Sequence, residues 1–395
     1  MLAVIETHPI QYHAPVYRVL QQRLGVPVTA IYGSDFSVAG YRDAEFGTTF
    51  AWDTDLLSGY TPLFLSRVDS GGATSAEAVS TGGLRDMLRA VRPTAVLIVG
   101  YSPRFHRQAW IEAWRSGCPI LFRGETVDGM VTSGLRSQMK RRALSLAYRS
   151  CDRLLYIGQR SLAHFRELGV DRDRLEFSPY CVDVTPFTTD EPARLQLRSL
   201  TRRSLGLTDD QVVLLFSGKL GARKGVDLLP AAVRALPEAL RTRVALLFVG
   251  DGPLRAELEA QVAAAPAMPA SFVGFQSQRA LSAFYHAADA LVLPSHSETW
   301  GLVVNEALHH GVPCVVSDRV GCVPDLIEEG RTGQVCAANS VPALAAAIQA
   351  VEPLVGRVSI RQICRDKVSH YSVTRAAEGI ARAYAAVSVR AGAHA

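Results

Sequence analysis

Residues 295–318 read SHSETWGLVVNEALHHGVPCVVSD and place two carboxylates, Glu298 and Glu306, in one strand–loop–helix unit. The apolar run Ala290–Leu293 before this stretch predicts a buried strand, and Gly301 opens a predicted helix. A helix start presents unpaired backbone N–H groups and the positive end of the helix dipole, which suit a diphosphate. Carboxylates on either side of an anion site indicate hydroxyl groups that flank the phosphates, as in a nucleoside diphosphate sugar.

The bulk composition is that of an ordinary globular chain. Its 395 residues are enough for two domains with separate cores, and 48% of them are hydrophobic and 20% charged. Lys and Arg number 42 against 37 Asp and Glu, which gives a formal net charge of +5. This mildly basic balance fits an anionic ligand and falls short of a nucleic-acid-binding profile.

The chain carries no pattern of a membrane span or a leader. Its apolar runs stop far short of the ~20 residues that cross a bilayer, and it begins with a predicted strand rather than a signal peptide. The seven cysteines are scattered without C-x-x-C spacing, which excludes a disulfide framework and a cysteine metal site. We therefore expect a cytoplasmic protein.

Short apolar runs recur along both halves of the chain, most of them continuous rather than alternating, as is typical of buried parallel strands. Helical stretches such as 253–262 and 341–351 separate them. This alternation predicts doubly wound α/β architecture. The expected strands are Leu2–Ile5, Val28–Tyr32, Ala95–Val99, Ile120–Phe122, Arg153–Ile157, Val212–Phe216, Ala245–Val249, Ser271–Val273, Ala290–Leu293, Cys314–Ser317 and Gly333–Cys336.

The segment between the halves is rich in Thr, Arg and Pro and lacks a strand pattern, which indicates a linker. We expect a first domain over 1–187, a linker over 188–207 and a second domain over 208–370. Ligands of open parallel sheets bind beyond the carboxyl ends of the strands. Two such domains facing a central cleft would therefore hold one substrate on each wall.

Three further segments of the second half accompany the two carboxylates. Residues 216–226, FSGKLGARKGV, predict a glycine-rich loop that carries Lys219 and Lys224; a phosphate site and a turn with solvated cations both fit this loop in isolation. Residues 246–255, LLFVGDGPLR, predict a strand, a turn and a helix. Residues 272–275, FVGF, end a strand, and their aromatic rings suit either a base pocket or the core.

In this order and spacing, residues 210–340 resemble the nucleotide-binding domain of family-four (group 1) retaining glycosyltransferases of the GT-B fold. The most specific pattern is the acidic pair with seven residues between, followed by A-L-x-x-G-x-P-x-V-x-S. The resemblance continues more loosely over 341–387. It implies two Rossmann-like domains and a C-terminal helix, residues 371–395, that crosses back to pack on the first domain.

The resemblance assigns catalytic roles in the second domain. Lys219, where the family usually has Arg, and Lys224 would contact the diphosphate, and Glu298 would face the transferred sugar. Glu306 would bind the ribose hydroxyls. The remaining donor-binding positions are Gly218, Gly250, Val273 and Phe275, with the main-chain amides of Gly301, Leu302 and Val303 on the phosphate oxygens.

The implied chemistry needs no cofactor and no metal. The transition state resembles an oxocarbenium ion that leaves a nucleoside diphosphate, so the protein must stabilise charge on the β-phosphate. Two lysines and a helix N-terminus supply that stabilisation. Retention by front-face attack, with the leaving phosphate accepting the proton, also comes with the resemblance.

The first domain departs from the family pattern at two strand ends. Residues 7–15, THPIQYHAP, stand where many relatives carry a Gly-Gly loop, and His8 and Gln11 offer hydrogen-bonding groups there. An acceptor site and a Pro-rich helix entry with exposed polar side chains both fit this segment. Further on, Glu125 stands where relatives often place a His, next to Arg123. The pair fits either a base that holds an acceptor hydroxyl or a structural ion pair.

Residues 136–149, RSQMKRRALSLAYR, predict a helix with five cations and an apolar face. Relatives of this architecture that dock on membranes do so through a basic first domain. The pattern fits peripheral contact with an anionic inner membrane face, and equally a solvated helix face.

The sequence as a whole predicts a glycosyltransferase that moves a sugar from a nucleoside diphosphate sugar to a hydroxyl acceptor, either a glycan, a lipid-linked molecule or a small molecule. Two alternatives share the features above. One is a non-hydrolysing sugar-nucleotide epimerase, and the other is a catalytically idle module that only binds sugar nucleotides.

Overall fold

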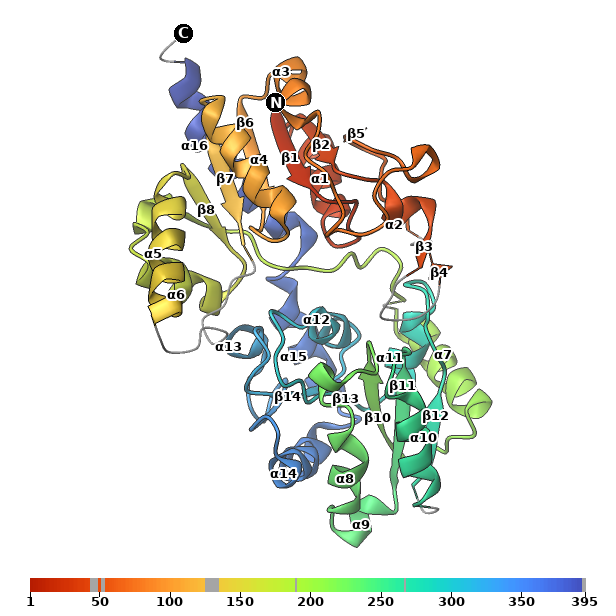
Figure 1. Ribbon diagram of the computed structural model, residues 1–395. Coiled ribbons are helices and arrows are strands. Elements are labelled where there is room, and N and C mark those ends of the chain that lie inside the picture. The colour runs from red at the N-terminus through yellow and green to blue at the C-terminus, as the bar shows by residue number, and fades with distance from the viewer. Residues whose placement is uncertain (43–48, 51–53, 125–134, 189, 266–267, 393–395) are drawn as a thin grey trace. The chain divides into compact units, whose positions relative to one another are not determined.

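The computed structural model describes residues 1–395 except 43–48, 51–53, 125–134, 189, 266–267 and 393–395, and the chain divides into two compact units (Figure 1). Unit 1 comprises Met1–Tyr41, Thr49–Asp183 and Tyr371–Ala395, and unit 2 comprises Arg42–Thr48 and Val184–His370. Each unit is built on a parallel sheet flanked by helices, which confirms the predicted α/β architecture. The cleft expected between two domains stays a prediction.

Unit 1 contains a seven-stranded parallel sheet with the order β5-β2-β1-β6-β7-β8-β9. Its strands are β1 (Leu2–Glu6), β2 (Val28–Tyr32), β5 (Thr61–Phe64), β6 (Ala95–Val99), β7 (Ile120–Arg123), β8 (Arg153–Tyr156) and β9 (Leu175–Phe177). Its helices are α1 (Ala14–Gln22), α2 (Phe36–Ala39), η1 (Val68–Ser70), α3 (Leu84–Val91), α4 (Arg104–Arg115), α5 (Leu135–Arg149), α6 (Gln159–Glu167), η2 (Arg172–Arg174) and α16 (Val373–Gly392). A separate two-stranded ribbon pairs β3 (Tyr41–Arg42) with β4 (Thr49–Phe50).

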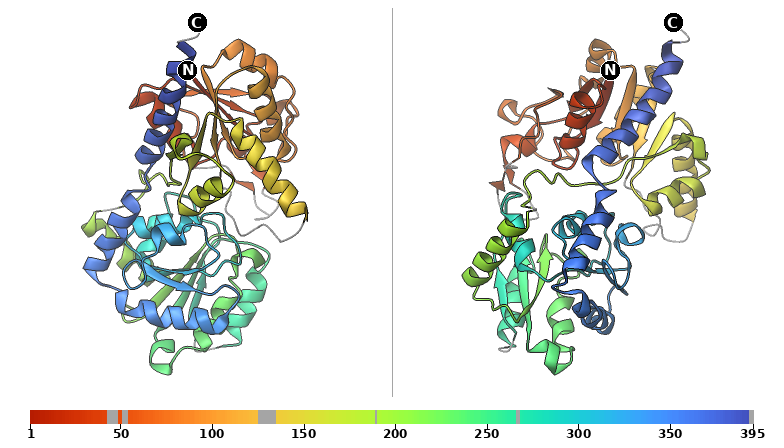
Figure 2. Two further views of the ribbon diagram at one scale, coloured as in Figure 1. Left: turned by 90° about the vertical axis from the view of Figure 1, so that its left-hand side faces the viewer. Right: turned by 180° about the vertical axis from the view of Figure 1, so that it is seen from behind.

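Helices cover both faces of this sheet. Successive residues of each strand point to opposite sides, so one strand packs against helices on both faces. Leu2 and Val4 of β1 pack with residues of α1 and α16, whereas Ala3 and Ile5 pack with residues of α3, α4 and α6. Figure 2 shows α16 lying along the sheet of unit 1. The amino group of Met1 donates to the Tyr384 hydroxyl of α16 at 2.7 Å, so the first strand and the last helix belong to one core.

Unit 2 contains a six-stranded parallel sheet with the order β12-β11-β10-β13-β14-β15. Its strands are β10 (Val212–Ser217), β11 (Val244–Val249), β12 (Ala270–Phe272), β13 (Ala290–Leu293), β14 (Cys314–Ser317) and β15 (Gly333–Cys336). Its helices are α7 (Glu191–Ser204), η3 (Ala222–Lys224), α8 (Leu228–Arg234), α9 (Glu238–Arg241), α10 (Arg255–Ala263), α11 (Leu281–Ala287), α12 (Leu302–His309), α13 (Val323–Leu326), α14 (Val341–Val351), η4 (Glu352–Leu354) and α15 (Val358–Ser369).

The two edge strands of unit 1, β5 and β9, lack the continuous apolar run from which the other strands are predicted. β5 reads T-P-L-F, and its residues are exposed or half-buried. β9 reads L-E-F, in which a charged residue interrupts a very short apolar run. An edge strand needs no continuous apolar sequence because only part of its surface is buried, and it tolerates proline.

The expected linker, 188–207, differs in the structure, because most of it forms helix α7 of unit 2 and packs against α11. The Asp190 side chain caps this helix by accepting from the amide of Ala193, and a proline follows in the first turn. Arg202 is only 1% exposed on the inner face of α7. A cation there breaks the apolar periodicity that would reveal the helix, and it is tolerated because a carboxylate pairs with it.

That carboxylate is Asp289, which stands just before β13 and is 7% exposed. Its oxygens accept from Arg202 Nη2 at 2.5 Å, from Arg198 Nη2 at 2.8 Å and from the amide of Val213 in β10 at 2.8 Å. Asp289 therefore joins α7 to the two central strands of unit 2.

We expect Asp289→Ala to destabilise unit 2 by about 3–5 kcal/mol, because it leaves the Arg202 guanidinium buried without its partner. Urea denaturation followed by tryptophan fluorescence measures this loss. The control is Glu352→Ala, which removes the partner of Arg243 in a pair whose side chains are 47% and 37% exposed; it should cost less than about 1 kcal/mol. Equal losses in the two variants would contradict this account.

Candidate functional site

The strand order reverses once in each sheet, between β1 and β6 in unit 1 and between β10 and β13 in unit 2. The loops that leave two such strands diverge to opposite faces, and ligands of doubly wound sheets bind in the crevice between them. The loop after β10 carries Lys219 and Lys224, and the loop after β13 carries Glu298. Lys219, Lys224 and Glu298, the predicted catalytic residues of the second domain, therefore lie on the two loops where the strand order of unit 2 reverses. This place is called the switch point of unit 2 below.

Close backbone packing fixes the loops at this edge of unit 2. Gly250 has a φ of 133°, and a Cβ on it would lie 1.9 Å from the carbonyl oxygen of Gly218. The amide of Gly218 in turn donates to Val249 O at 2.8 Å. At Gly225, a Cβ would lie 2.3 Å from the carbonyl oxygen of Pro294. Only glycine permits these approaches, which bring the loops after β10, β11 and β13 together.

Glu298 and Lys224 meet across these loops, because Lys224 Nζ donates to Glu298 Oε2. The two side chains are 13% and 19% exposed, so both remain accessible to a ligand. The amide of His296 donates to the carbonyl of Arg223 at 2.9 Å, which joins the same two loops through their backbones. The structure thus brings together two residues that are 74 positions apart in sequence.

Helix α12 begins at Leu302, and the residue that precedes it, Gly301, has a φ of 96° in the left-handed region. A Cβ there would lie 2.8 Å from the side chain of Val320, so the helix start packs tightly on the loop after β14. The first N–H groups of any α-helix have no acceptor within that helix, and in α12 these include the amides of Leu302 and Val303. Their N–H groups and the helix dipole make this end of α12 suited to an anion.

Glu306, on the same helix, is 2% exposed. Its Oε2 accepts from the Tyr285 hydroxyl at 2.7 Å. Burial raises the pKa of the Glu306 carboxyl to about 7, although hydrogen bonds from Tyr285 and Gln278 act in the opposite direction. Among the described residues no cation is recorded that would keep the Glu306 carboxylate ionised, unlike the pairing of Glu298 with Lys224.

The segment Val273–Phe275 follows β12, next to the loop after β11. The amide of Gly250 donates to Gly274 O at 2.8 Å, and Gln276 Nε2 donates to Val273 O at 2.8 Å. Phe275 is 38% exposed, whereas Phe272 is half-buried and stacks on the buried Phe248 with ring centroids 4.5 Å apart. Phe275 is thus the more accessible aromatic ring of the two.

Unit 1 has a buried carboxylate of its own at its switch point. Glu6 ends β1 and is 1% exposed, and its Oε1 accepts from His13 Nδ1 and from the Tyr17 hydroxyl, both at 2.6 Å. Burial acts to raise the pKa of Glu6, but the charge and hydrogen bond of His13 and the hydrogen bond of Tyr17 outweigh it and hold the pKa below its usual value. Glu6 is therefore an ionised carboxylate in the interior.

Three buried acceptor atoms of unit 1 have no hydrogen-bond partner within the described parts of the chain: Glu6 Oε2, Gln11 Oε1 on the segment that follows β1, and His106 Nε2, whose ring interacts electrostatically with Glu6. His106 donates from Nδ1 to Ser102 O at 2.8 Å, and burial lowers the pKa of its ring, so Nε2 carries a lone pair. The predicted acceptor-side residue His8 lies in the same cluster, with Nδ1 2.8 Å from Thr7 Oγ1. Burial lowers the pKa of His8 to about 4.

Arg123 is 3% exposed and donates to the carbonyl oxygens of Ser178 and Pro179 at 3.3 and 2.7 Å. Its guanidinium also lies over the Tyr180 ring, 5.1 Å from the centroid. These contacts tie the end of β7 to the segment after β9. Glu125, the other predicted residue of this loop, lies outside the described residues.

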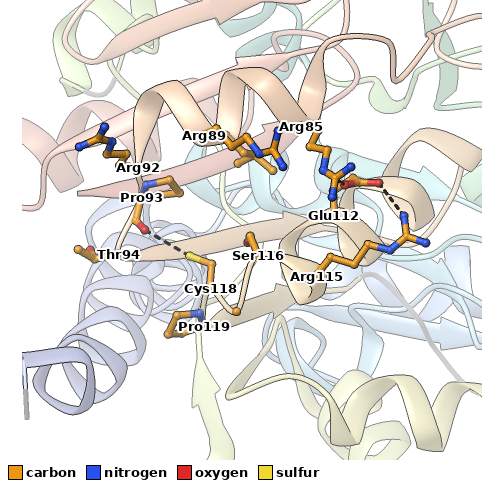
Figure 3. Close-up of a pocket in the computed structure, with 12 residues that line it drawn as sticks. Arg85, Arg89, Arg92, Pro93, Thr94, Glu112, Arg115, Ser116, Cys118 and Pro119 are labelled. Atoms are coloured by element: carbon orange, nitrogen blue, oxygen red, sulfur yellow. Dashed lines mark hydrogen bonds and ion pairs between the residues drawn. The ribbon is translucent and has the colours of Figure 1, made fainter. Parts of the chain in front are cut away.

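A pocket of about 490 Å³ in unit 1 lies away from all predicted site residues (Figure 3). Arg85, Arg89, Arg92 and Arg115 line it beside the residues that precede β6 and β7, at the amino ends of the strands. Glu112 accepts from Arg115 at 3.1 Å and pairs with Arg85 at 3.7 Å. Ligands of such sheets bind at the opposite, carboxyl edge, so we do not assign the predicted chemistry to this pocket.

The described residues contain no group of three or more His, Cys, Asp and Glu side chains placed to hold a metal ion. All seven cysteines lie in described parts of the chain and are free thiols. No single described helix has the length and apolarity of a membrane span; the bent pair Val341–Leu354 and Val358–Ser388 meets those two criteria jointly, with a 111° angle.

Residues 198–353 match the family of glycosyl transferases group 1. Sulfoquinovosyl transferase SQD2 of Arabidopsis thaliana is 41% identical over 127 residues, which cover 31% of this chain and 23% of that protein. A D-inositol 3-phosphate glycosyltransferase of Geodermatophilus obscurus is 34% identical over 230 residues, covering 56% of this chain and 49% of that protein. The chain therefore spans half or less of the length of these curated relatives.

Solved structures extend the likeness to the whole chain at the level of the fold. Sucrose-phosphate synthase of Thermosynechococcus elongatus aligns with a TM-score of 0.71 at 17% identity, covering 98% of this chain and 99% of that one. HepE of Anabaena, solved in complex with UDP-glucose, aligns with a TM-score of 0.70 at 16% identity and the same coverage. The chain resembles group 1 glycosyltransferases of the GT-B fold, as its motifs predict.

Sequence reasoning missed Glu6, His106 and Tyr285. Glu6 is a charged residue at the end of the apolar run L-A-V-I-E, and that position was a usable signal, since the carboxyl ends of central strands carry function. Neither His106 nor Tyr285 stands in a motif. His106 is recognised by its burial and its electrostatic interaction with Glu6, and Tyr285 by its hydrogen bond to Glu306, 21 residues away.

The raised pKa of Glu306 predicts a pH-dependent stability difference. The carboxyl ionises near its ordinary value in the unfolded chain and at about 7 in the fold, so the folded state loses stability as the pH rises through this window. Glu306→Gln cannot ionise but still accepts from Tyr285. We expect the Tm of this variant minus that of the natural chain to increase from about pH 5 to about pH 8, by up to about 3 kcal/mol in free energy.

Thermal scans in buffers across this range measure the difference. Glu352→Gln, a substitution of an exposed carboxylate in unit 2, is the control and should show no such trend. A Tm difference for Glu306→Gln that stays constant with pH would contradict the prediction.

Proposed function

We propose that this chain is a retaining, metal-independent glycosyltransferase that moves a sugar from a nucleoside diphosphate sugar to a hydroxyl acceptor. The observation that carries the proposal is the contact of Glu298 with Lys224 beside the start of α12, at the switch point of unit 2. A carboxylate, a cation and a set of helix amides at one place match the hydroxyls and phosphates of a sugar nucleotide.

The donor would lie along the carboxyl edge of unit 2. Its diphosphate would meet Lys219, Lys224 and the amides of Gly301, Leu302 and Val303, and its base would meet main-chain groups of Val273–Phe275. Glu306 would bind the ribose hydroxyls. A uridine diphosphate sugar is a suitable first donor, since HepE was solved with UDP-glucose.

Lys224 would serve the chemistry by stabilising the charge that develops on the β-phosphate as the sugar leaves. The ion pair with Glu298 orients the lysine before the donor binds, so less reorganisation is needed in the transition state. Glu298 would face the transferred sugar and accept from one of its hydroxyls. We propose front-face attack, in which the leaving phosphate takes the proton of the acceptor hydroxyl.

The acceptor would bind to unit 1, where the buried atoms Glu6 Oε2, Gln11 Oε1 and His106 Nε2, which have no partner among the described residues, are hydrogen-bond acceptors. Such atoms are satisfied by a molecule that offers several donors, such as the hydroxyl groups of a sugar or another polyol. His8 and Gln11 belong to this proposed site. Glu6 and His106 join it as additions to the residues predicted from sequence.

One experiment tests the donor and the acceptor together. A panel of sugar nucleotides is scored for release of nucleoside diphosphate, with and without crude acceptor extract, in parallel with equilibrium binding of the free nucleotide. Glu298→Ala should lower turnover at least about 100-fold while largely keeping nucleotide affinity. Glu6→Gln should lower only the extract-dependent release, because its carboxylate lies in the other unit.

The outcomes separate the alternatives. Isomerisation of the donor without an acceptor would identify an epimerase, and nucleotide binding without any turnover would identify an idle binding module. Glu352→Gln is the control for a distant carboxylate and should behave like the natural chain. Full activity in Glu298→Ala would overturn the proposed site.

We further propose a cytoplasmic protein that contacts an anionic membrane surface through unit 1. Met139 and Leu146 of α5 are 63% and 66% exposed, although both are large and apolar. They lie on a helix that also carries Lys140 and Arg142. Exposed apolar side chains among cations are the composition of an interfacial helix.

Sedimentation with vesicles that contain anionic lipid tests this contact. The natural chain should sediment at low salt, and Met139→Glu together with Leu146→Glu should reduce the bound fraction at least about tenfold. The matched control is Leu195→Glu, which changes a 53% exposed leucine of α7 in unit 2. No sedimentation of the natural chain, or an equal loss in the control, would refute the membrane contact.

A further inference from the structure

The pocket of unit 1 drawn in Figure 3 has the size of a small-molecule binding site. Its volume is about 490 Å³, within the roughly 300–1,000 Å³ that ligand pockets have. Helix α3, the end of α4 and the segments that precede β6 and β7 line it. The pocket therefore lies at the amino ends of the strands, away from the residues that we propose for the transfer reaction.

Four arginines line this pocket, three of them at α3. Arg85 and Arg89 are about one helical turn apart, and Arg92 follows at the C-cap, so the three positions extend over about 10 Å along the helix. Arg115 is the last residue of α4. Figure 3 shows Arg85 beside Arg115 at one end of the pocket and Arg92 at the other. The positive charge is thus spread along the pocket instead of gathered at one point.

One carboxylate, that of Glu112, serves two of these arginines. Arg115 donates to Glu112 Oε1 at 3.1 Å, and Arg85 Nε lies 3.7 Å from Oε2, too far for a hydrogen bond. The Arg85 and Arg115 side chains are 60% and 54% exposed, so both remain accessible to a ligand. Ion pairs that are so open to water are weak, and a bound anion can extend or replace them.

Arg89 and Arg92 are less constrained than this pair. Arg89 Nη1 lies 3.8 Å from Asp86, and the two side chains are 67% and 84% exposed. Arg92 is exposed, and its side chain forms no ion pair or hydrogen bond with a described residue. Both guanidinium groups can therefore donate to a ligand without the loss of a hydrogen bond in the described part of the chain.

The backbone of Arg92 indicates a role for this residue beyond stability. Its φ of 49° is in the left-handed region at the end of α3, where glycine is usual and a Cβ brings strain. Asn339 is the other described residue with a side chain and a positive φ, and asparagine tolerates that conformation. Strained positions cluster at ligand-binding sites, and Arg92 is strained where glycine would not be.

An anion in this pocket would meet a net positive charge. The C-terminal ends of α3 and α4 both lie at the pocket, and their dipoles together contribute about one negative charge. Four guanidinium groups against the carboxylate of Glu112 leave three positive charges among the described lining residues. About two positive charges therefore remain, which a ligand with two or more negative charges would neutralise.

Much of the remaining wall of the pocket is apolar. Leu88 lines it from α3, and Pro93, Cys118 and Pro119 line it from the segments before β6 and β7. The Cys118 thiol donates to Pro93 O at 3.4 Å, so its own donor is satisfied. Such a surface suits the carbon skeleton of an organic molecule better than a bare inorganic ion.

We propose that this pocket binds a small organic anion that carries two separated phosphate groups. One phosphate would accept from the two arginines beside Glu112, and the other from Arg89 and Arg92. A phosphate group offers three acceptor oxygens to the forked N–H groups of two arginines, whereas a carboxylate offers two. A single phosphate cannot reach cations that are spread over about 10 Å. This site is independent of the proposed transfer reaction.

Isothermal titration calorimetry of the full chain at constant ionic strength, balanced with chloride, tests the proposal. Fructose 1,6-bisphosphate, whose phosphates stand at opposite ends of the molecule, is the probe, and fructose 6-phosphate is its matched control. The bisphosphate should bind at one site per chain and at least about tenfold more tightly than the monophosphate, because a second set of charge-assisted hydrogen bonds forms. Equal affinities, or no saturable binding of the bisphosphate, would overturn the proposal.

Variants of two arginines place the probe in this pocket. Arg89→Gln and Arg92→Gly should each weaken bisphosphate binding, and together they should weaken it at least about fivefold. Arg107→Gln is the control, since it changes an exposed arginine of α4 that is not among the lining residues. An unchanged affinity in the double variant, or an equal loss in the control, would refute the site.

The Tm of Arg92→Gly without ligand separates binding from stability. This Tm should not fall below that of the natural chain, because glycine relieves the backbone strain. A clear fall would show that Arg92 serves the stability of α3 and would count against the proposal. Lys224→Met, in the candidate donor site, should keep the full bisphosphate affinity; a loss there would place the probe in unit 2 instead.

Cys118 gives a second readout inside the pocket. It is half-buried, whereas the other six cysteines are buried. Burial raises the pKa of its thiol to about 11, so iodoacetamide should alkylate it slowly. The bisphosphate should slow this alkylation in proportion to the bound fraction, as measured by peptide mass spectrometry. An unchanged rate at saturating bisphosphate would contradict the proposed position of the ligand.

A polyglutamate peptide distinguishes a small ligand from an acidic segment of another protein. The peptide should bind more weakly than the bisphosphate under the same conditions, because its carboxylates offer fewer acceptor oxygens to each arginine. Binding of the peptide without binding of the bisphosphate would identify a protein-docking surface and overturn the proposal.

Discussion

The candidate site of unit 2 depends on how closely backbone can approach backbone where β10, β11 and β13 end. At Gly218 and Gly250 the two loops are so close that a single methyl group on Gly250 would overlap the carbonyl oxygen of Gly218. Gly225 makes the same approach to Pro294, at the start of the loop that carries Glu298. These glycines hold the loops close enough for Lys224 to meet Glu298. The start of α12 at Gly301 packs closely in the same way, against Val320.

Each unit holds a carboxylate in its interior next to a tyrosine hydroxyl, and the two behave in opposite ways. Glu6 has His13 beside it, and the charge and hydrogen bonds of its neighbours outweigh burial and lower its pKa. Glu306 meets two neutral donors among the described residues, Tyr285 and Gln278, and its pKa rises to about 7. The first carboxylate is fixed in its ionised form by the protein, whereas the second would gain most from a ligand that offers it hydroxyl donors.

The sequence predicted the central strands of both sheets, because continuous apolar runs mark strands that are buried on both faces. It also placed Lys224 and Glu298 on neighbouring loops, since the resemblance rests on motifs that surround both. It did not predict α7, whose inner face carries Arg202, or β5, whose sequence includes a proline in an exposed edge. It gave no sign that Glu306 is enclosed by Tyr285, because that contact joins two helices.

The chain leaves unit 1 at Asp183 and returns to it only at Tyr371, so the core of the first unit is completed by the last helix. Ala376, Ala377 and Ile380 of α16 are buried in the same cluster as Leu2 and Val4 of the first strand. During synthesis, one apolar face of the unit 1 sheet therefore stays uncovered until α16 has left the ribosome. Unit 2, which is continuous from Val184 to His370 apart from a short segment after β3, has all its strands available earlier. The strands of unit 2 are therefore complete before the core of unit 1 can be closed by its last helix.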